Sequence, residues 1–311
     1  MTPIAADTVG ADKSPHPLST RVGCSLLLML SSGCWLALDL EGNQYTRAGG
    51  ASAGGAGGAA ASGGGGSSDP HAGMVFVEHG EADFYIDATE VTNRAYAAWL
   101  NQAVPPTPAL IDDSRCAWNT SFAPGVLDTC GIEVDALCVA FAETFDEIAA
   151  TSPDRPIACI DWCDAFAYCE LNGKHLCGGP GGARIEFNPD YPGAFVTSIS
   201  EWFFACGGDG ELAYPYGAAL EPARCNDDAN SLGTLVDVGS MAGCEGSFDG
   251  VFDLSGNAEE WVNACYLGDA PEASCARAGG AYYDDQPSCT ASRLFERSCQ
   301  TNGTGFRCCA D

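Results

Sequence analysis

The sequence predicts an α+β fold that is rich in disulfides and modest in regular secondary structure. Sixteen cysteines lie between Cys116 and Cys309, short β-rich runs stand beside a few amphipathic helices, and the chain is glycine-rich from residue 178 onward. Residues 48–68 contain only Ala, Gly and Ser and cannot bury an apolar core. We therefore expect one folded domain over residues 69–311.

The expected elements begin with two short strands and a helix. Residues 74–77 and 84–87 are rich in β-branched and aromatic side chains, which favours strands. Thr92 is a suitable N-cap for the helix that follows. The apolar face of this helix is formed by Ala95, Tyr96, Trp99 and Leu100.

The middle of the domain contains an irregular stretch and then a second helix. Residues 103–156 hold many Pro, Asp and Cys with weak periodicity, so we expect an excursion that disulfides hold in place. Asp161 is placed to cap a helix, and Gly173 to end it. Between them, apolar residues recur at helical spacing: Trp162, Ala165, Phe166 and Cys169.

Charge and cysteine content restrict the class of protein. With 13 Lys+Arg against 42 Asp+Glu, the net charge is −29, so nucleic acid and anionic membrane surfaces are excluded as partners. The cysteines form no Cys-x-x-Cys pair, which argues against a zinc ribbon or a thioredoxin-like site. An even number of cysteines predicts a disulfide framework and a compartment outside the cytoplasm.

The N-terminus predicts export. Residues 1–34 contain Arg21, a short apolar run and a Ser-Ser-Gly-Cys ending, so we interpret them as a signal peptide with a lipobox-like end. Lipid on Cys34 would be the only attachment to a membrane. Residues 35–68 then form a flexible linker. The alternative is ordinary cleavage and release as a secreted protein.

Four segments in fixed order resemble the formylglycine-generating enzyme family, also called sulfatase-modifying factor. They are residues 84–93 (FYIDATEVTN), residues 155–176 around DWCDA and GKHL, residues 252–261 (FDLSGNAEEW), and the pair RAGG at 277–280 and GFRC at 305–308. The resemblance covers residues 74–309 and implies a C-type-lectin-like fold variant.

The resemblance also indicates where catalysis takes place in the family. Members that oxidise a substrate cysteine use two cysteines five residues apart, which bind copper(I). Cys289 matches the second of them, whereas Asp284 occupies the position of the first, and its carboxylate is a hard ligand unsuited to copper(I). A disulfide is the other interpretation of Cys289. A further candidate for acid–base chemistry is His175, oriented by Asp161 or Asp164.

Two calcium sites are also implied by the resemblance. The first would use the side chains of Asp253 and Glu260, which flank a tight turn whose carbonyls face the ion. The carbonyls would come from Gly256 and Ala258. The second would begin at Asn226 and the Asp227 carbonyl, and its usual later acid is hard to place because the segment 231–234 is shorter than in the active enzymes. The alternative for the first segment is a turn without metal.

We therefore expect a secreted, lipid-tethered and non-catalytic module of the cell envelope, stabilised by calcium. Its partner would be an extracellular ligand or an envelope protein. The alternative is a formylglycine-generating oxidase, or a diverged oxidase, that uses Cys289 on a sulfatase-type cysteine substrate with copper(I). A third possibility is a purely structural envelope lipoprotein.

Overall fold

The computed structural model describes residues 69–311 except 81, 126–129, 131–135, 187–199, 209 and 267. The predicted signal peptide 1–34, with Cys34, and the linker 35–68 lie outside the described residues. No helix in the described part of the chain is both long and apolar enough to cross a membrane.

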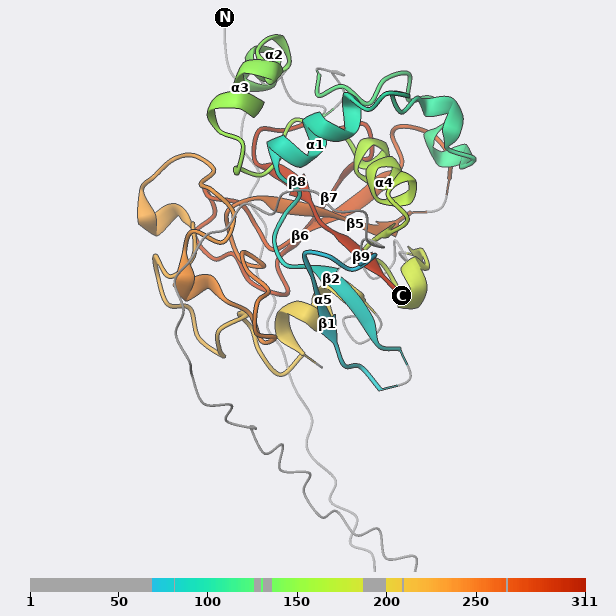
Figure 1. Ribbon diagram of the computed structural model, residues 1–311. Coiled ribbons are helices and arrows are strands. Elements are labelled where there is room, and N and C mark those ends of the chain that lie inside the picture. The colour runs from blue at the N-terminus through green and yellow to red at the C-terminus, as the bar shows by residue number, and fades with distance from the viewer. Residues whose placement is uncertain are drawn as a thin grey trace, which may run out of the picture. The chain divides into compact units, whose positions relative to one another are not determined.

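One sheet joins the two ends of the domain. It has the order β1-β2-β9-β3 and every pair in it is antiparallel (Figure 1). Its strands are β1 (Met74–Val77), β2 (Phe84–Asp87), β3 (His175–Leu176) and β9 (Cys308–Ala310). The two strands predicted at 74–77 and 84–87 are confirmed with the same bounds.

The second sheet carries the candidate site. Its strands are β4 (Ile185–Glu186), β5 (Glu259–Cys265), β6 (Ser274–Ala278), β7 (Ser292–Glu296) and β8 (Thr304–Phe306). β5 pairs antiparallel with β6 and parallel with β4 and β8. Because Arg307 alone separates β8 from β9, the chain passes directly from the second sheet to the first.

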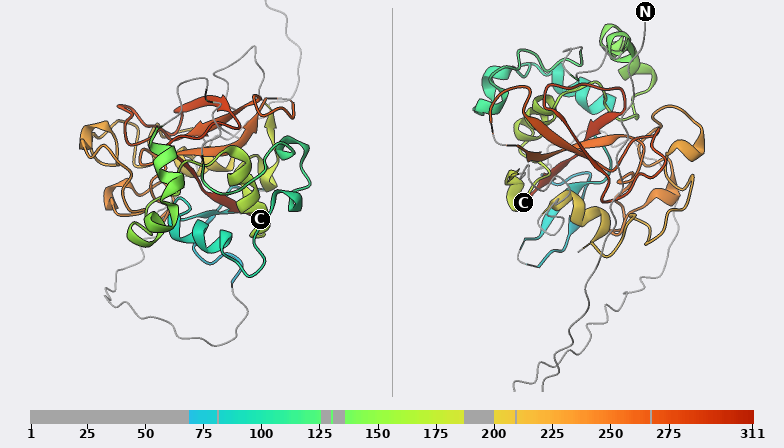
Figure 2. Two further views of the ribbon diagram at one scale, coloured as in Figure 1. Left: turned by 90° about the horizontal axis from the view of Figure 1, so that it is seen from above. Right: turned by 180° about the vertical axis from the view of Figure 1, so that it is seen from behind.

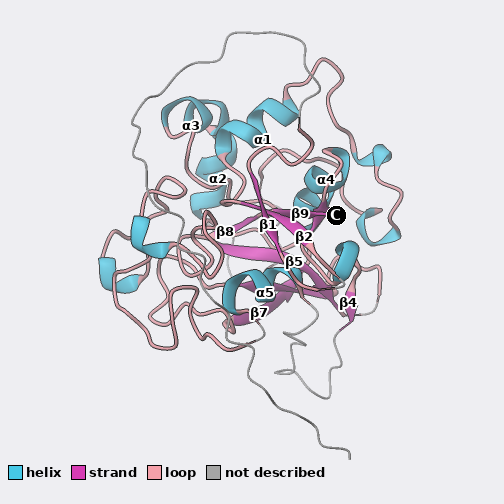
Figure 3. Cartoon of the chain, turned by 60° about the horizontal axis from the view of Figure 1, so that its bottom comes forward, coloured by secondary structure: helices cyan, strands magenta, loops and turns pink. Residues whose placement is uncertain are grey.

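Helices surround the strands (Figure 3). They are α1 (Asn93–Leu100), α2 (Ala136–Glu143), α3 (Phe145–Thr151), α4 (Trp162–Leu171) and α5 (Glu201–Gly207). Short 3₁₀ turns are η1 (Pro108–Leu110), η2 (Ser114–Cys116), η3 (Pro180–Gly182), η5 (Asp228–Asn230) and η6 (Ala242–Cys244). The predicted caps are confirmed: Thr92 accepts from the Ala95 amide at 3.2 Å, and Asp161 forms a capping box with Asp164.

The central strand β5 is covered on both faces (Figure 2). Trp261 packs into a core that includes α1 and α4, whereas Val262 and Ala264 pack into a second core that includes α5. Successive side chains of a strand point to opposite faces, so a strand with all seven residues buried needs cover on both sides. The polar residues at its start must consequently find partners inside the protein.

The disulfide prediction is confirmed. All sixteen cysteines from Cys116 to Cys309 are paired. The pairs are 116–163, 130–299, 138–159, 169–308, 177–309, 206–289, 225–244 and 265–275. Three of them hold the excursion over 103–156. That stretch also contains α2 and α3, which the sequence did not predict because α2 has almost no polar side chain to mark an exposed face.

Candidate functional site

The loop between β6 and β7 carries the positions that resemble the family's catalytic pair. It begins with Gly279 and Gly280, whose φ angles are +88° and +75°. A Cβ at Gly279 would lie 3.1 Å from the Trp202 ring, and one at Gly280 would lie 2.9 Å from Pro287. Both positions therefore need glycine, because the backbone is left-handed there and packed against neighbours.

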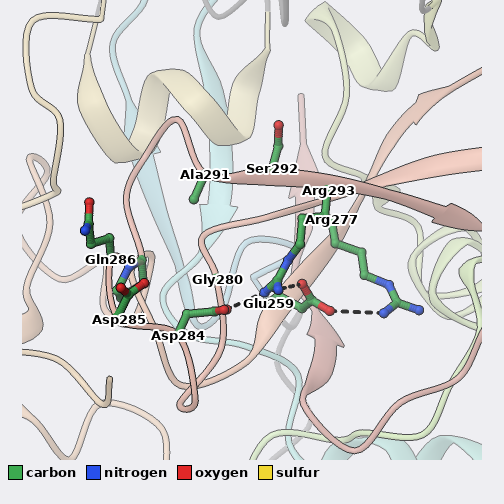
Figure 4. A pocket seen from close by; sticks show the side chains of 10 residues that line it. Glu259, Arg277, Gly280, Asp284, Asp285, Gln286, Ala291, Ser292 and Arg293 are labelled. Atoms are coloured by element: carbon green, nitrogen blue, oxygen red, sulfur yellow. Dashed lines mark hydrogen bonds and ion pairs between the residues drawn. The ribbon is translucent and has the colours of Figure 1, made fainter. Parts of the chain in front are cut away.

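A pocket of about 230 Å³ opens beside this loop, and we call it the Asp284 pocket (Figure 4). Glu259, at the start of β5, lies 3.0 Å from Nη1 of Arg277 and 3.2 Å from Nη2 of Arg293. Asp284 accepts a hydrogen bond from Arg293 and one of 2.7 Å from the Ala281 amide. Two acids and two arginines thus neutralise one another around the pocket.

Burial makes the central pair of this network energetically significant. The side chains of Glu259 and Arg277 are 2% and 0% exposed, and the Arg277 guanidinium stacks 4.0 Å from the Trp261 ring centre. Glu259 also accepts from the Thr304 hydroxyl at 3.0 Å. Sequence reasoning missed this network. The signal was two residues of opposite charge, Glu259 and Arg277, close to apolar residues in the same two runs, since charged residues need a partner when buried.

Cys289 is bonded to Cys206 of α5 and is 2% exposed. Its amide donates to the Ala213 carbonyl at 2.9 Å. A disulfide sulfur is neither a thiolate nucleophile nor a thiolate ligand. Since the other position carries Asp284 in an ion pair, the two positions of the family's cysteine pair do not fit copper(I) in this structure.

The residues of the first predicted calcium site lie close together, but both of its acids already accept hydrogen bonds from other groups of the protein. Both carboxylate oxygens of Glu260 accept from Arg307, at 2.8–3.0 Å, and one also accepts from the Trp202 indole at 2.9 Å. Asp253 accepts from the Gly239 amide at 2.6 Å. Glu260 consequently serves as an ion-pair partner here and does not fit calcium, since cationic and indole N–H groups face its oxygens.

The turn of this set has the expected geometry. Gly256 has φ +78°, and a Cβ on it would lie 2.4 Å from the Asn226 carbonyl oxygen. Gly256 therefore lies directly against Asn226, the first residue of the second predicted set, and the Asn257 amide donates to the Asn226 carbonyl at 2.8 Å. The structure brings the two sets together at one place.

In the second predicted set, one of the two proposed calcium ligands is free to bind an ion and the other is already hydrogen-bonded. The side-chain Nδ2 of Asn226 donates to the Thr234 carbonyl and to Asn257 Oδ1. The Asn226 Oδ1 is buried and has no donor among the described residues. The Asp227 carbonyl, the other predicted ligand, already accepts from the Asn230 amide at 3.1 Å. An amide oxygen without a donor in the interior is the type of group that a cation satisfies.

Glu90 adds a carboxylate that sequence reasoning did not assign to this place. It is 2% exposed, Oε1 accepts from Asn257, and Oε2 has no donor. Burial first, and then the neighbouring Asp253 carboxylate, raise the pKa of Glu90 well above its usual value. Glu90, Asp253 and Glu260 are gathered around Arg307, and burial raises the pKa of Asp253 as well as that of Glu90, so these carboxyls hold protons more readily than free ones do.

His175 does not meet the acids considered with it. Its Nε2 lies 3.0 Å from Glu201, which also accepts from the Gly178 amide. Asp161 and Asp164 instead cap α4, and Asp164 accepts from Asn119 at 2.9 Å. The three residues therefore form no acid–base constellation. Among the residues that the structure describes, no group of three or more His, Cys, Asp or Glu side chains has a geometry suited to a metal.

Comparison with known proteins agrees with the resemblance. A formylglycine-generating enzyme of Thermomonospora curvata is 28% identical over 296 residues, covering 78% of this chain and 88% of that protein. A formylglycine-generating enzyme of Bos taurus is 22% identical over 274 residues, covering 73% of this chain and 66% of that protein.

Solved structures with a similar arrangement include CarF, with a TM-score of 0.44 and 18% identity over 73% of this chain and 86% of that one. PvdO from Pseudomonas aeruginosa has a TM-score of 0.43 and 16% identity over 73% of this chain and 80% of that one. The model of the sulfatase-modifying factor enzyme 1-like domain matches residues 55–311. The chain therefore belongs to the sulfatase-modifying factor family.

Proposed function

We propose that the protein is a non-catalytic member of its family that acts as a binding or scaffold module in the cell envelope. The observation that carries the proposal is the state of the two positions that resemble the catalytic pair. Cys289 is bonded to Cys206, and Asp284 is paired with Arg293. Neither offers the thiolate that copper(I) chemistry on a cysteine requires.

The alternative is the oxidase that the names of both relatives describe. Non-reducing peptide mapping of the natively secreted protein separates the two. We expect one peptide pair that joins Cys206 to Cys289 and no turnover of a Cys-x-Pro-x-Arg peptide supplied with copper(I) and oxygen. Cys206→Ser, which frees the Cys289 thiol, is the matched control and should remain inactive. Turnover by the native protein would overturn the proposal.

Calcium is the second part of the proposal, as a stabilising ion rather than a reactant. The support is the cluster of buried carboxyl groups around Arg307 and two buried acceptors that lack donors among the described residues, Glu90 Oε2 and Asn226 Oδ1. Calcium at one hundred times its dissociation constant should add about 2.7 kcal/mol to the free energy of unfolding. Glu90→Gln should reduce that gain, and magnesium serves as the control ion. Unchanged stability in millimolar calcium would remove calcium from the proposal.

Attachment to the membrane through Cys34 is the third part, supported by the lipobox-like sequence. A bacterium that expresses the full chain should incorporate labelled fatty acid into it, and Cys34→Ser should release the label and the protein together. Release of the unchanged protein without label would favour ordinary secretion. Pull-down from envelope extracts then separates a ligand-binding module from a purely structural lipoprotein.

A further inference from the structure

A second pocket is lined by residues of α1, α2 and α3 together with the segments 152–158 and 233–235, and it shares no lining residue with the Asp284 pocket. The three helices lie side by side in Figures 1 and 3. The pocket has a volume of about 350 Å³ and apolar walls that include Phe141, Ile148 and Leu235. We call it the Arg155 pocket after its one charged lining residue. Its size and lining are those of small-molecule sites.

Asn93 lines this pocket and carries a buried acceptor without a donor among the described residues. It is the first residue of α1 and is 1% exposed. Its amide donates to the Arg155 carbonyl at 2.9 Å, and its Nδ2 donates to the Ser152 carbonyl at 3.0 Å. These two bonds fix the side chain, while Oδ1 has no donor among the described residues. A buried amide oxygen in this state gains free energy from a ligand N–H or O–H.

Arg155 presents an unpaired charge beside it. Arg155 is half-buried, and its guanidinium has no hydrogen bond or ion pair to any described residue. The other arginines of the described chain each donate to a carboxylate or a carbonyl. In a protein of net charge −29, a cation without an internal partner is unusual, and no acid lines this pocket. The complementary ligand group is a carboxylate, which arginine binds through two parallel hydrogen bonds.

We propose that the Arg155 pocket binds an apolar α-amino acid unit through its carboxylate, its α-nitrogen and its side chain. Arg155 binds the carboxylate, Asn93 Oδ1 accepts from the N–H, and the walls formed by Phe141, Ile148 and Leu235 enclose the side chain. Such a unit exists as a free amino acid and as the C-terminal residue of a peptide. The inference names a ligand class for the proposed binding function. It rests on that function only in assuming that the domain binds a ligand.

Calorimetric titration of the full chain tests the proposal with three probes. L-phenylalanine and N-acetyl-L-phenylalanine both keep the carboxylate, and the second mimics a peptide C-terminus. L-phenylalaninamide lacks the carboxylate and should bind about tenfold to a hundredfold more weakly, as expected for the loss of a charged hydrogen bond. Binding of the acetylated probe indicates a peptide end, and binding of the free amino acid alone indicates a metabolite.

Variants locate the site. Arg155→Met should weaken both carboxylate probes by the same factor of about ten to one hundred. Arg94→Met is the matched control, because Arg94 directly follows Asn93 in the chain, is 64% exposed and is paired with Asp154 outside the pocket. This control should bind as the native protein does.

Absence of binding by both carboxylate probes at millimolar concentration would overturn the inference, and so would equal binding by Arg155→Met. Either failure leaves the proposed function intact, because that proposal is tested separately by the Cys206–Cys289 peptide map and the oxidase assay. Comparison of the three probes on the native protein needs no variant, so a folding defect in Arg155→Met would not decide the result.

Discussion

The Asp284 pocket and the Arg155 pocket differ in what their polar groups contact. In the first, both carboxylates are paired with arginines, Glu259 with Arg277 and Arg293 and Asp284 with Arg293, with only Arg277 Nε left without a partner among the described residues, and the adjoining Cys289 is bonded. In the second, the Arg155 guanidinium and Asn93 Oδ1 have no partner among the described residues. Internal pairing stabilises a fold, whereas an unpaired polar group in a pocket is available to a ligand. The contrast supports a structural role for the positions that resemble the catalytic pair, and it is the basis for proposing a ligand at the Arg155 pocket.

The largest expected effect is on the bridge beside the Asp284 pocket. Replacing both Cys206 and Cys289 by Ala opens a loop of sequence separation 83 and should lower the free energy of unfolding by about 5 kcal/mol. The double replacement of Cys265 and Cys275, with separation 10, is the control and should cost about 3 kcal/mol. Chemical denaturation measures both. An unchanged stability for the first pair would contradict a structural role for this bridge.

Breaking the buried ion pair should have the next largest effect. Glu259→Gln leaves the Arg277 guanidinium buried without its counter-charge and should cost about 4 kcal/mol. Arg293→Gln removes a partner that is 43% exposed and should cost less than about 1 kcal/mol. The two variants are compared by urea denaturation with the disulfides intact. Equal losses of unfolding free energy in the two variants would show that burial does not make the Glu259–Arg277 pair more important than the Glu259–Arg293 pair.

The pH dependence of stability tests the effect of burying carboxyl groups that have no cationic partner among the described residues, as at Asp161 and Asp164. Burial raises the pKa of Asp161 to about 7 and also raises the pKa of the neighbouring Asp164. Between about pH 4 and pH 7 the folded protein thus holds a proton that the unfolded chain has lost. Stability should therefore fall by more than about 1 kcal/mol as the pH rises through this window.

Asp161→Asn keeps an oxygen for the cap and cannot ionise, so its stability should change less between the same pH values. Denaturation midpoints measured at half-unit steps from pH 4 to pH 8 provide the comparison. Parallel curves for the native protein and the variant would rule out Asp161 as the source.

The smallest effect is expected at the Arg155 pocket. Arg155→Met removes a guanidinium that bonds to no described residue, so the free energy of unfolding should change by less than about 0.5 kcal/mol. Thermal denaturation without ligand checks this value. A loss comparable with that of Glu259→Gln would reveal a structural partner for Arg155 and would remove the contrast between the two pockets.

The sequence determined the parts of this protein that depend on local chemistry. The strands at 74–77 and 84–87, the caps at Thr92 and Asp161 and the full pairing of the cysteines follow from side-chain type and spacing within one element or from the parity of the cysteine count. Four short segments in order were also sufficient to indicate the family.

Tertiary structure decided the parts that depend on residues distant in the chain. Pairing of Cys289 with Cys206, engagement of Glu260 by Arg307 and the meeting of Glu259 with Arg277 and Arg293 each require the strand register and the passage from β8 to β9. That the Arg155 guanidinium and Asn93 Oδ1 have no partner among the described residues likewise depends on everything packed around them. No local pattern encodes it, because a partner's absence is defined only once every neighbour has been placed.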